Sequence, residues 1–218
     1  MPMSNQGIGR ILGHGSAGDA VASPSPARIG PNAVIQTGQA LSALYGVGAA
    51  RLIFESAGLG RHLEAPPTAM IDEREPVALF AAIRAMLPPA EADRVLAEAG
   101  YRTAHYILDH RIPPLARKTL PKLHPALASR LLVSAIARHA WTFAGSGVFR
   151  GRVMDWTKPR VRLEIVGNPL ATPGCPWHGA VFQRLFGTLC GSAATARHLE
   201  CCASGQNRCV TELLCTST

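Results

Sequence analysis

The sequence predicts an α+β fold in which an N-terminal helical extension packs on a C-terminal domain built around an antiparallel sheet. Two observations predict it. Apolar residues recur at helical spacing between proline breaks through residues 28–144, whereas residues 145–218 contain two pairs of alternating segments around a single helical stretch. This order favours an α+β domain over a parallel α/β domain. Residues 1–27 are rich in Gly, Ser, Ala and Pro without a period, and we expect a disordered tail there.

Glycines and prolines divide the helical region. A helix is expected to enter at Pro31 and to loosen or end at Gly46 and Gly48, with a second short helix over 51–57. Three further helices are expected from apolar stripes that begin at or just after a proline. Their predicted bounds are 76–87, 91–110 and 125–143.

The last third of the chain changes to alternating spacing, which is typical of strands. We expect two strands before a turn at Asn168-Pro169, an amphipathic helix after it, and then two more strands joined by ASGQNR. The predicted bounds of these elements are 148–156, 161–166, 178–189, 198–202 and 209–214. Residues 145–218 therefore form the predicted α+β ligand-binding domain.

The charge balance favours acidic partners, because 22 Lys and Arg against 14 Asp and Glu give a formal net charge of +8. The densest basic cluster, residues 111–122, contains three prolines and accompanies no nucleic-acid-binding motif. We interpret it as a solvated loop and expect no nucleic-acid partner. The first residues lack a secretory signal, and the longest uncharged run, residues 29–50, is too polar to span a bilayer. A cytoplasmic protein is expected.

All six cysteines lie between Cys175 and Cys215, which is typical of metal binding rather than of a disulfide scaffold. Zinc takes four thiolate or imidazole ligands in a tetrahedron, and a site closed in this way is structural. Two alternatives stay open, a set of buried free cysteines and Cys202 in place of Cys201. The predicted zinc ligands are Cys175, His198, Cys201 and Cys209.

The C-terminal stretch resembles the 4-vinyl reductase domain, a small ligand-binding module that is also the sensor part of phenol-responsive bacterial transcription activators. The resemblance rests on CPWHGAVFQRLFGTLCG from Cys175 and on HLECCASGQNRC over 198–209. The corresponding positions of the sensor relatives bind zinc, and the resemblance implies the same for Cys175, Cys201 and Cys209. His198 stands where those relatives carry Glu, and Glu200 is a nearby alternative ligand.

Most of the chain beyond residue 27 resembles the bacteriochlorophyll 4-vinyl reductase-type proteins, the bacteriochlorophyll biosynthesis protein J family. The stretches that carry this resemblance are 27–41, 100–113, 139–149 and 167–186. The resemblance implies a role between magnesium porphyrin and bacteriochlorophyll and, from the family's name, reduction of the 8-vinyl group of a chlorophyllide or protochlorophyllide precursor. Other pathway enzymes, such as magnesium chelatase or the methyltransferase, are then expected partners. A homodimer and a peripheral place at the photosynthetic membrane are compatible with it.

A magnesium tetrapyrrole needs a flat apolar slot, aromatic walls, an axial ligand and basic residues for its carboxylates. The candidate tetrapyrrole-binding residues are His139, Trp141, Trp177 and His178. The helical spacing places His139 on the apolar face of its helix. Each of the four has a structural alternative as a core residue or a helix flank. Further options are Arg138, Arg150 and Arg152 for carboxylates, and His105 and His110 as ligands.

A reductase also needs an electron source. The glycine runs at 7–13 and 45–51 lack the strand–turn–helix setting of a dinucleotide-binding turn, and the cysteine spacing fits no ferredoxin pattern. The sequence therefore favours a protein that binds a magnesium-tetrapyrrole intermediate and delivers it between pathway enzymes. A vinyl reductase that uses an external electron donor and a small-molecule sensor are the alternatives.

Overall fold

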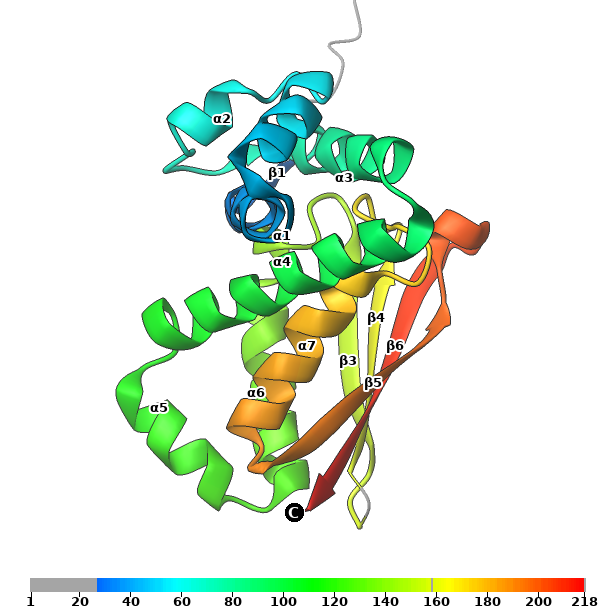
Figure 1. Cartoon of the computed structure of the whole chain (residues 1–218). Coiled ribbons are helices and arrows are strands. Elements are labelled where there is room, and N and C mark those ends of the chain that lie inside the picture. The colour runs from blue at the N-terminus through cyan, green and yellow to red at the C-terminus, as the bar shows by residue number, and fades with distance from the viewer. Residues whose placement is uncertain (1–26, 158, 218) are drawn as a thin grey trace, which may run out of the picture.

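The computed structural model describes residues 27–157 and 159–217. Its N-terminal part is a layer of helices at the upper end of the molecule in Figure 1. These helices are α1 (Asn32–Ser56), α2 (Arg61–Glu64), α3 (Arg74–Met86) and α4 (Pro89–His110). A short antiparallel pairing of β1 (Arg28–Ile29) with β2 (Ile71–Asp72) joins the start of this layer to the segment before α3.

Gly46 interrupts α1 with φ 84° and ψ 164°, which are not helical values. This conformation is readily open only to glycine, because a Cβ would clash with the backbone. The predicted break at this residue is confirmed.

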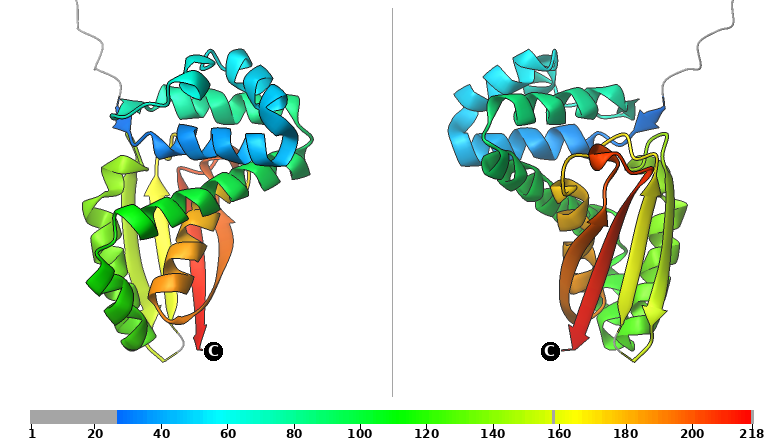
Figure 2. Two further views of the ribbon diagram at one scale, coloured as in Figure 1. Left: turned by 60° about the vertical axis from the view of Figure 1, so that its left-hand side comes forward. Right: turned by 90° about the vertical axis from the view of Figure 1, so that its right-hand side faces the viewer.

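A four-stranded antiparallel sheet forms the C-terminal part, with the strand order β3-β4-β6-β5. Its strands are β3 (Val148–Asp155), β4 (Arg160–Val166), β5 (Ser192–Glu200) and β6 (Arg208–Ser217). Burial alternates along β4, where Val161, Leu163 and Ile165 are enclosed in the core. One face of the sheet is therefore covered, and Figure 2 shows the other face open. The α+β class predicted from the sequence is confirmed.

Helices α6 (Pro125–Arg138) and α7 (Pro176–Leu189) cover the inner face of the sheet, and α4 crosses over α7 (Figure 1). The crossing is close at Gly100 of α4, where an added Cβ would lie 2.2 Å from the backbone oxygen of Trp177. A larger residue would push the two helices apart, because protein cores have little free space. One continuous apolar core joins the helical layer to the sheet. The division at residue 145 stays a prediction.

Two sequence-based expectations about local structure are wrong. The helix predicted to reach residue 143 ends at Arg138 and gives way to a 3-10 turn, Ala140–Thr142. The turn redirects the chain so that Phe143 packs against Phe149 and Phe182. The basic stretch 111–122 is not a loop, because it contains α5 (Pro114–Thr119) and a 3-10 turn (Leu120–Lys122). Its prolines occupy first-turn positions, where a helix does not need the missing N–H.

The other predicted elements differ from the observed ones mainly at their ends. The strand expected to begin at residue 198 begins at Ser192, because the small residues before His198 also pair with β6. The predicted tail lies outside the described residues, apart from Ala27. Within the described ranges, every helix is too short or too polar to cross a bilayer.

Candidate metal centre and adjoining groove

Three buried cysteines meet where α7 begins and β5 passes into β6. The Sγ atom of Cys175 lies 3.3 Å from that of Cys209 and 3.7 Å from that of Cys201. The ligand atoms of Cys175, His198 and Cys201 all lie within 4.8 Å of one another. The fold therefore brings three of the predicted zinc ligands together, with the fourth, Cys209, against Cys175, although the four span 35 positions of the chain.

The backbone at the cluster is shaped to aim these side chains. Cys175 caps α7 with φ 45° and is the one non-glycine residue with a positive φ in the described part of the chain. A left-handed conformation is unfavourable for a residue with a Cβ, and such residues concentrate at functional sites. On the other side, a bulge between His198 and Glu200 and a left-handed Gly205 turn the chain between β5 and β6. Cys201 and Cys209 lie at the two ends of that turn.

The Cys209 sulfur is the main hydrogen-bond acceptor of the cluster. It accepts from the Cys175 thiol, from the Cys202 backbone N–H at 3.3 Å and from Asn168 Nδ2 at 3.4 Å. These hydrogen bonds lower the pKa of Cys209 to about 5, and the bond from Cys175 has the largest effect. The same bond, together with burial, raises the pKa of Cys175. A cluster that already stabilises one thiolate suits a cation, because the thiolate is the metal-binding form.

His198 supplies a buried nitrogen without a partner. Its Nδ1 lies 3.5 Å from the Thr211 hydroxyl, whereas its Nε2 is buried and has no hydrogen-bond partner among the described residues. Burial lowers the pKa of His198, so the ring is neutral at pH 7. An unpaired buried polar atom is uncommon in folded proteins, and a metal ion is one of the partners that explains it.

Three thiols and one neutral imidazole fit zinc, which forms structural sites of this composition. Glu200, the alternative to His198, is engaged elsewhere. Its carboxylate accepts hydrogen bonds from Arg208 at 2.7 and 3.0 Å and from Arg162 at 3.3 Å. The bond to Arg208 is the main reason that the pKa of Glu200 is lowered. The geometry therefore favours His198 over Glu200 as the fourth ligand.

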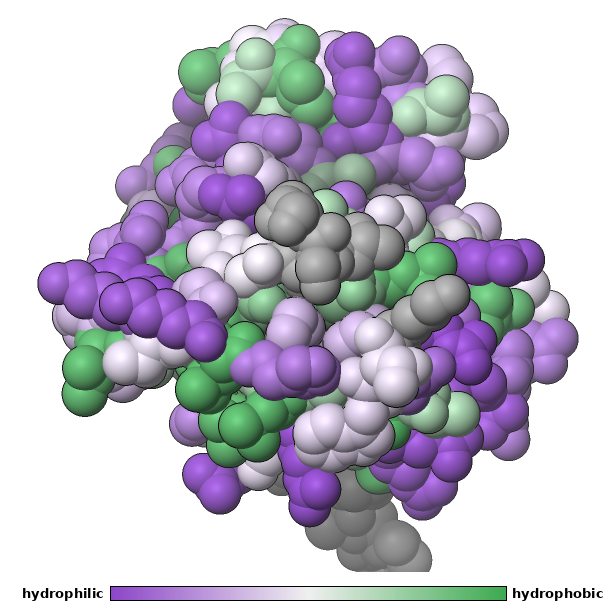
Figure 3. All heavy atoms as spheres, turned by 90° about the horizontal axis from the view of Figure 1, so that it is seen from below, coloured by the Kyte–Doolittle hydropathy of each residue, from purple (hydrophilic) through white to green (hydrophobic). Residues whose placement is uncertain are grey.

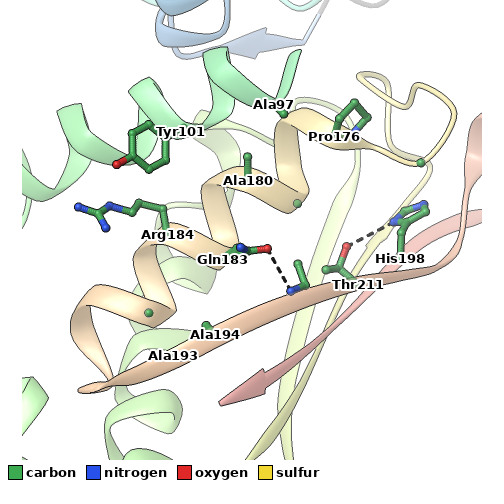
Figure 4. Close-up of a pocket in the computed structure, with 14 residues that line it drawn as sticks. Ala97, Tyr101, Pro176, Ala180, Gln183, Arg184, Ala193, Ala194, His198 and Thr211 are labelled. Atoms are coloured by element: carbon green, nitrogen blue, oxygen red, sulfur yellow. Dashed lines mark hydrogen bonds between the residues drawn. The ribbon is translucent and has the colours of Figure 1, made fainter. Parts of the chain in front are cut away.

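A groove of about 670 Å³ begins beside this cluster and follows α7 between α4 and β5 (Figure 4). Eight of its fourteen lining residues are Gly or Ala, including Gly179 and Ala180 on α7. Side chains this small leave a smooth wall, and a Cβ added at Gly179 would meet nothing within 4 Å. The groove has room for a ligand at that point.

Polar side chains stand at the ends of the groove (Figure 4). His198 and Thr211 lie at the end next to the cysteine cluster, and Tyr101 and Arg184 lie at the other end. The Arg184 guanidinium is centred 5.2 Å from the Tyr101 ring. His198 thus borders both the cysteine cluster and the groove.

Comparison with known proteins places this chain in a family. The chain is 43% identical over 190 residues to the bacteriochlorophyll synthase 23 kDa chain of Cereibacter sphaeroides, covering 86% of this chain and 90% of the relative. The chain belongs to the family of bacteriochlorophyll synthase 23 kDa chains. A second member, from Rhodobacter capsulatus, is 36% identical over 198 residues, covering 87% of this chain and 90% of that member.

Membership of this family supports a role in bacteriochlorophyll biosynthesis, which is the broader part of the predicted resemblance. The family's name does not refer to a vinyl reductase, and no protein-family model matches the chain. The 4-vinyl reductase part of the resemblance therefore stays a prediction.

Solved structures confirm the fold class independently of the sequence. An Fe(II) unliganded H-NOX protein mutant from K. algicida aligns with a TM-score of 0.60 at 11% identity, covering 87% of this chain and 98% of that chain. A structure described as probing heme distortion in the H-NOX family aligns with a TM-score of 0.58 at 12% identity, covering 87% and 96%. At such low identity the likeness concerns the fold alone.

The four predicted tetrapyrrole-binding residues of this family member do not share one cavity. His139 is exposed after the last turn of α6, so its placement on the apolar face of that helix is wrong. Trp141 is 55% exposed, whereas Trp177 and His178 are both 3% exposed in the first turn of α7. None of the four lines the groove.

His178 is nevertheless unusual, because both of its ring nitrogens are buried and make at most a weak contact with the Phe143 backbone among the described residues. Burial lowers the pKa of this ring to about 4, which keeps it neutral. It packs edge-on against Trp177, with ring centroids 4.8 Å apart.

Proposed function

We propose that this chain binds a magnesium-tetrapyrrole intermediate of bacteriochlorophyll biosynthesis in the groove between α4, α7 and β5 and delivers it between enzymes of the pathway. The groove wall of glycine and alanine carries the proposal. A planar macrocycle needs a smooth apolar wall, and a volume of about 670 Å³ lies inside the usual range of ligand pockets. Its open side would leave the ligand accessible for transfer.

The polar ends of the groove match the polar groups of such a ligand. Chlorophyll precursors carry carboxylate or ester side chains at one edge of the ring. Arg184 can form a charge-assisted hydrogen bond with a carboxylate there, and the neighbouring Tyr101 adds an aromatic face. In this arrangement the apolar ring lies along Gly179 and Ala180.

Zinc at the four-residue cluster would have a structural part in this function. Cys175 lies at the start of α7, His198 lies on β5 and Cys209 lies on β6. One ion held by these residues and Cys201 would link the two walls of the groove. A closed set of four protein ligands leaves no open position for catalysis.

The comparisons support the ligand class. The relatives are named as chains of a bacteriochlorophyll synthase, and the structural neighbours include proteins whose descriptions concern heme, another tetrapyrrole. The rival function is a vinyl reductase with an external electron donor. It predicts the same ligand class but adds consumption of reducing equivalents.

Titration of the zinc-analysed protein with magnesium protoporphyrin and its monomethyl ester, followed by absorbance and fluorescence, tests the proposal. The informative variant is Gly179→Leu, since its Cβ would enter the groove with no protein atom within 4 Å. The matched control is Gly48→Leu, which changes another helical glycine with nothing within 4 Å of its added Cβ. One-to-one binding that is lost in Gly179→Leu and kept in Gly48→Leu is the expected result.

Two other outcomes would overturn parts of the proposal. Loss of binding in His139→Ala, with Gly179→Leu unaffected, would move the site to the residues predicted from the sequence. Oxidation of added reduced nicotinamide together with a vinyl-to-ethyl product would identify a reductase. Absence of binding to both porphyrins would reject the carrier function.

A further inference from the structure

Exposed leucines and basic residues lie on the elements at the lower end of the molecule in Figure 1. This end is built from α5, the first turns of α6 and the turn between β3 and β4. We call this end the basal surface. It is defined by Leu115, Lys118, Lys122, Leu127, Arg130, Leu131 and Trp156.

The apolar members of the basal surface are large and exposed. Leu115 of α5 is 73% exposed, Leu131 of α6 is 47% exposed and Trp156 in the turn is 48% exposed. Leu127 lies one helical turn before Leu131 and is also exposed, so the two share one outward face of α6. From below, a group of hydrophobic side chains lies to the lower left of the middle, with hydrophilic side chains beside it (Figure 3). Grouped apolar exposure of this kind marks an interaction site.

Most of the charges around these side chains are positive. Residues 110–154, which include α5 and α6, contain eight Lys or Arg and no Asp or Glu. Lys118, Lys122 and Arg130 are exposed and form no ion pair with the described residues. Asp109 and Asp155 flank this stretch: Asp109 forms an ion pair with Arg117 of α5, and the Asp155 carboxylate accepts hydrogen bonds from Thr157. The basal surface therefore presents cationic groups to its surroundings.

We propose that the basal surface docks on an anionic lipid bilayer. Transfer of exposed leucines from water to the boundary between headgroups and acyl chains lowers the free energy. The long side chains of lysine meanwhile keep their charges at the headgroups. Tryptophan favours the same interface. This end lies away from the groove, which is lined by residues elsewhere in the molecule. A flat bilayer needs no matching cavity, whereas phosphates of a nucleic acid would leave the leucines without a partner. The inference does not rest on tetrapyrrole binding.

Flotation of the full chain with vesicles tests this inference. Binding is expected to be weak on phosphatidylcholine alone, to rise with phosphatidylglycerol content and to fall with added salt. The Trp156 emission should shift to shorter wavelength on binding, and the shift should disappear in Trp156→Phe. A basic residue near an anionic bilayer changes partitioning about fivefold, so reversal of one charge in Lys118→Glu should weaken binding about tenfold or more.

Matched variants away from the basal surface distinguish binding through this surface from an effect of the overall charge or apolar content of the protein. Arg138→Glu reverses an exposed charge at the other end of α6, and it should leave binding nearly unchanged. Leu115→Ser should weaken binding, whereas Leu52→Ser on α1, which is 61% exposed, should not. Equal effects within either pair would overturn the proposed location. Equal binding to neutral vesicles, or binding to nucleic acid or an acidic protein but not to vesicles, would reject the lipid partner.

Discussion

Helix α7 has a buried cysteine at each end, and the two ends differ in what surrounds the sulfur. At the start, Cys175 lies among two other cysteines, a neutral histidine and hydrogen-bond donors. At the end, Cys190 lies in the apolar core beside Cys215, and its sulfur is 3.4 Å from the Ser129 hydroxyl. The first environment stabilises a thiolate and the second opposes one. Burial by itself therefore does not indicate the role of a cysteine in this fold; the neighbouring polar groups do.

The largest difference between the two ends of α7 is expected in zinc binding and in the stability that zinc provides. Cys175→Ser should abolish zinc binding and lower the free energy of unfolding by at least about 4 kcal/mol, because a metal bound only to the folded state stabilises it. Metal analysis and urea unfolding, with and without a chelator, measure both effects. The matched variant Cys190→Ser should keep its zinc. If both variants retain equal zinc, Cys175 is not a ligand, and if the unmodified chain itself binds none, the cluster is a set of free thiols.

The fourth ligand can be tested by comparing His198 with Glu200. His198→Ala should weaken zinc affinity strongly, since it removes one of four ligands, whereas Glu200→Gln should leave affinity close to that of the unmodified chain. A competition titration with a zinc-binding dye measures the ratio. Weaker zinc binding in Glu200→Gln alone would return the ligand role to the carboxylate, despite its bonds to Arg208.

The cysteine and histidine cluster could be predicted from the sequence because its residues flank a helix and a tight turn. Cys175 precedes an amphipathic stretch, and Gly205 lies midway between Cys201 and Cys209, so local spacing alone brings most of the set together. The groove could not be predicted in this way. Tyr101 belongs to a helix whose position over α7 depends on the close approach at Gly100. That approach depends on tertiary packing, which spacing along one helix does not encode.

The helical stripe that placed His139 on an apolar face shows a related limit. The stripe continues through Ile136, which is buried, but the helix ends two residues later. Helix spacing therefore no longer describes the side chains after Arg138. The small residues at Gly179, Ala180 and Gly187 were the signal available for the groove, because they recur at helical spacing on the face of α7 that lines it.

At the other end of α7, the buried Cys190 thiol should make the free energy of unfolding depend on pH. Burial raises the pKa of the Cys190 thiol from 9.0 to about 11. The unfolded chain loses this proton first, so the stabilisation is complete below pH 9 and is lost as the pH rises through about 11. Two pKa units correspond to about 3 kcal/mol. Measurements of the free energy of unfolding between pH 8 and 11 should show this loss. The Cys190→Ala variant should lack the part of the pH dependence that Cys190 causes. If the pH dependence is the same in Cys190→Ala, other groups cause the loss of stability.

The smallest effect is expected at Cys202, the cysteine adjacent to the cluster that was the sequence-based alternative to Cys201. Its backbone N–H donates to the Cys209 sulfur, and its side chain is partly exposed. By contrast, the Cys201 sulfur is buried and donates to the Thr172 carbonyl oxygen at 3.2 Å. Cys202→Ser keeps the backbone donor, so zinc content should stay the same and stability should change by less than about 0.5 kcal/mol. Cys201→Ser should lose the metal. The reverse pattern would exchange the two roles and require the turn between β5 and β6 to shift by one residue when zinc binds.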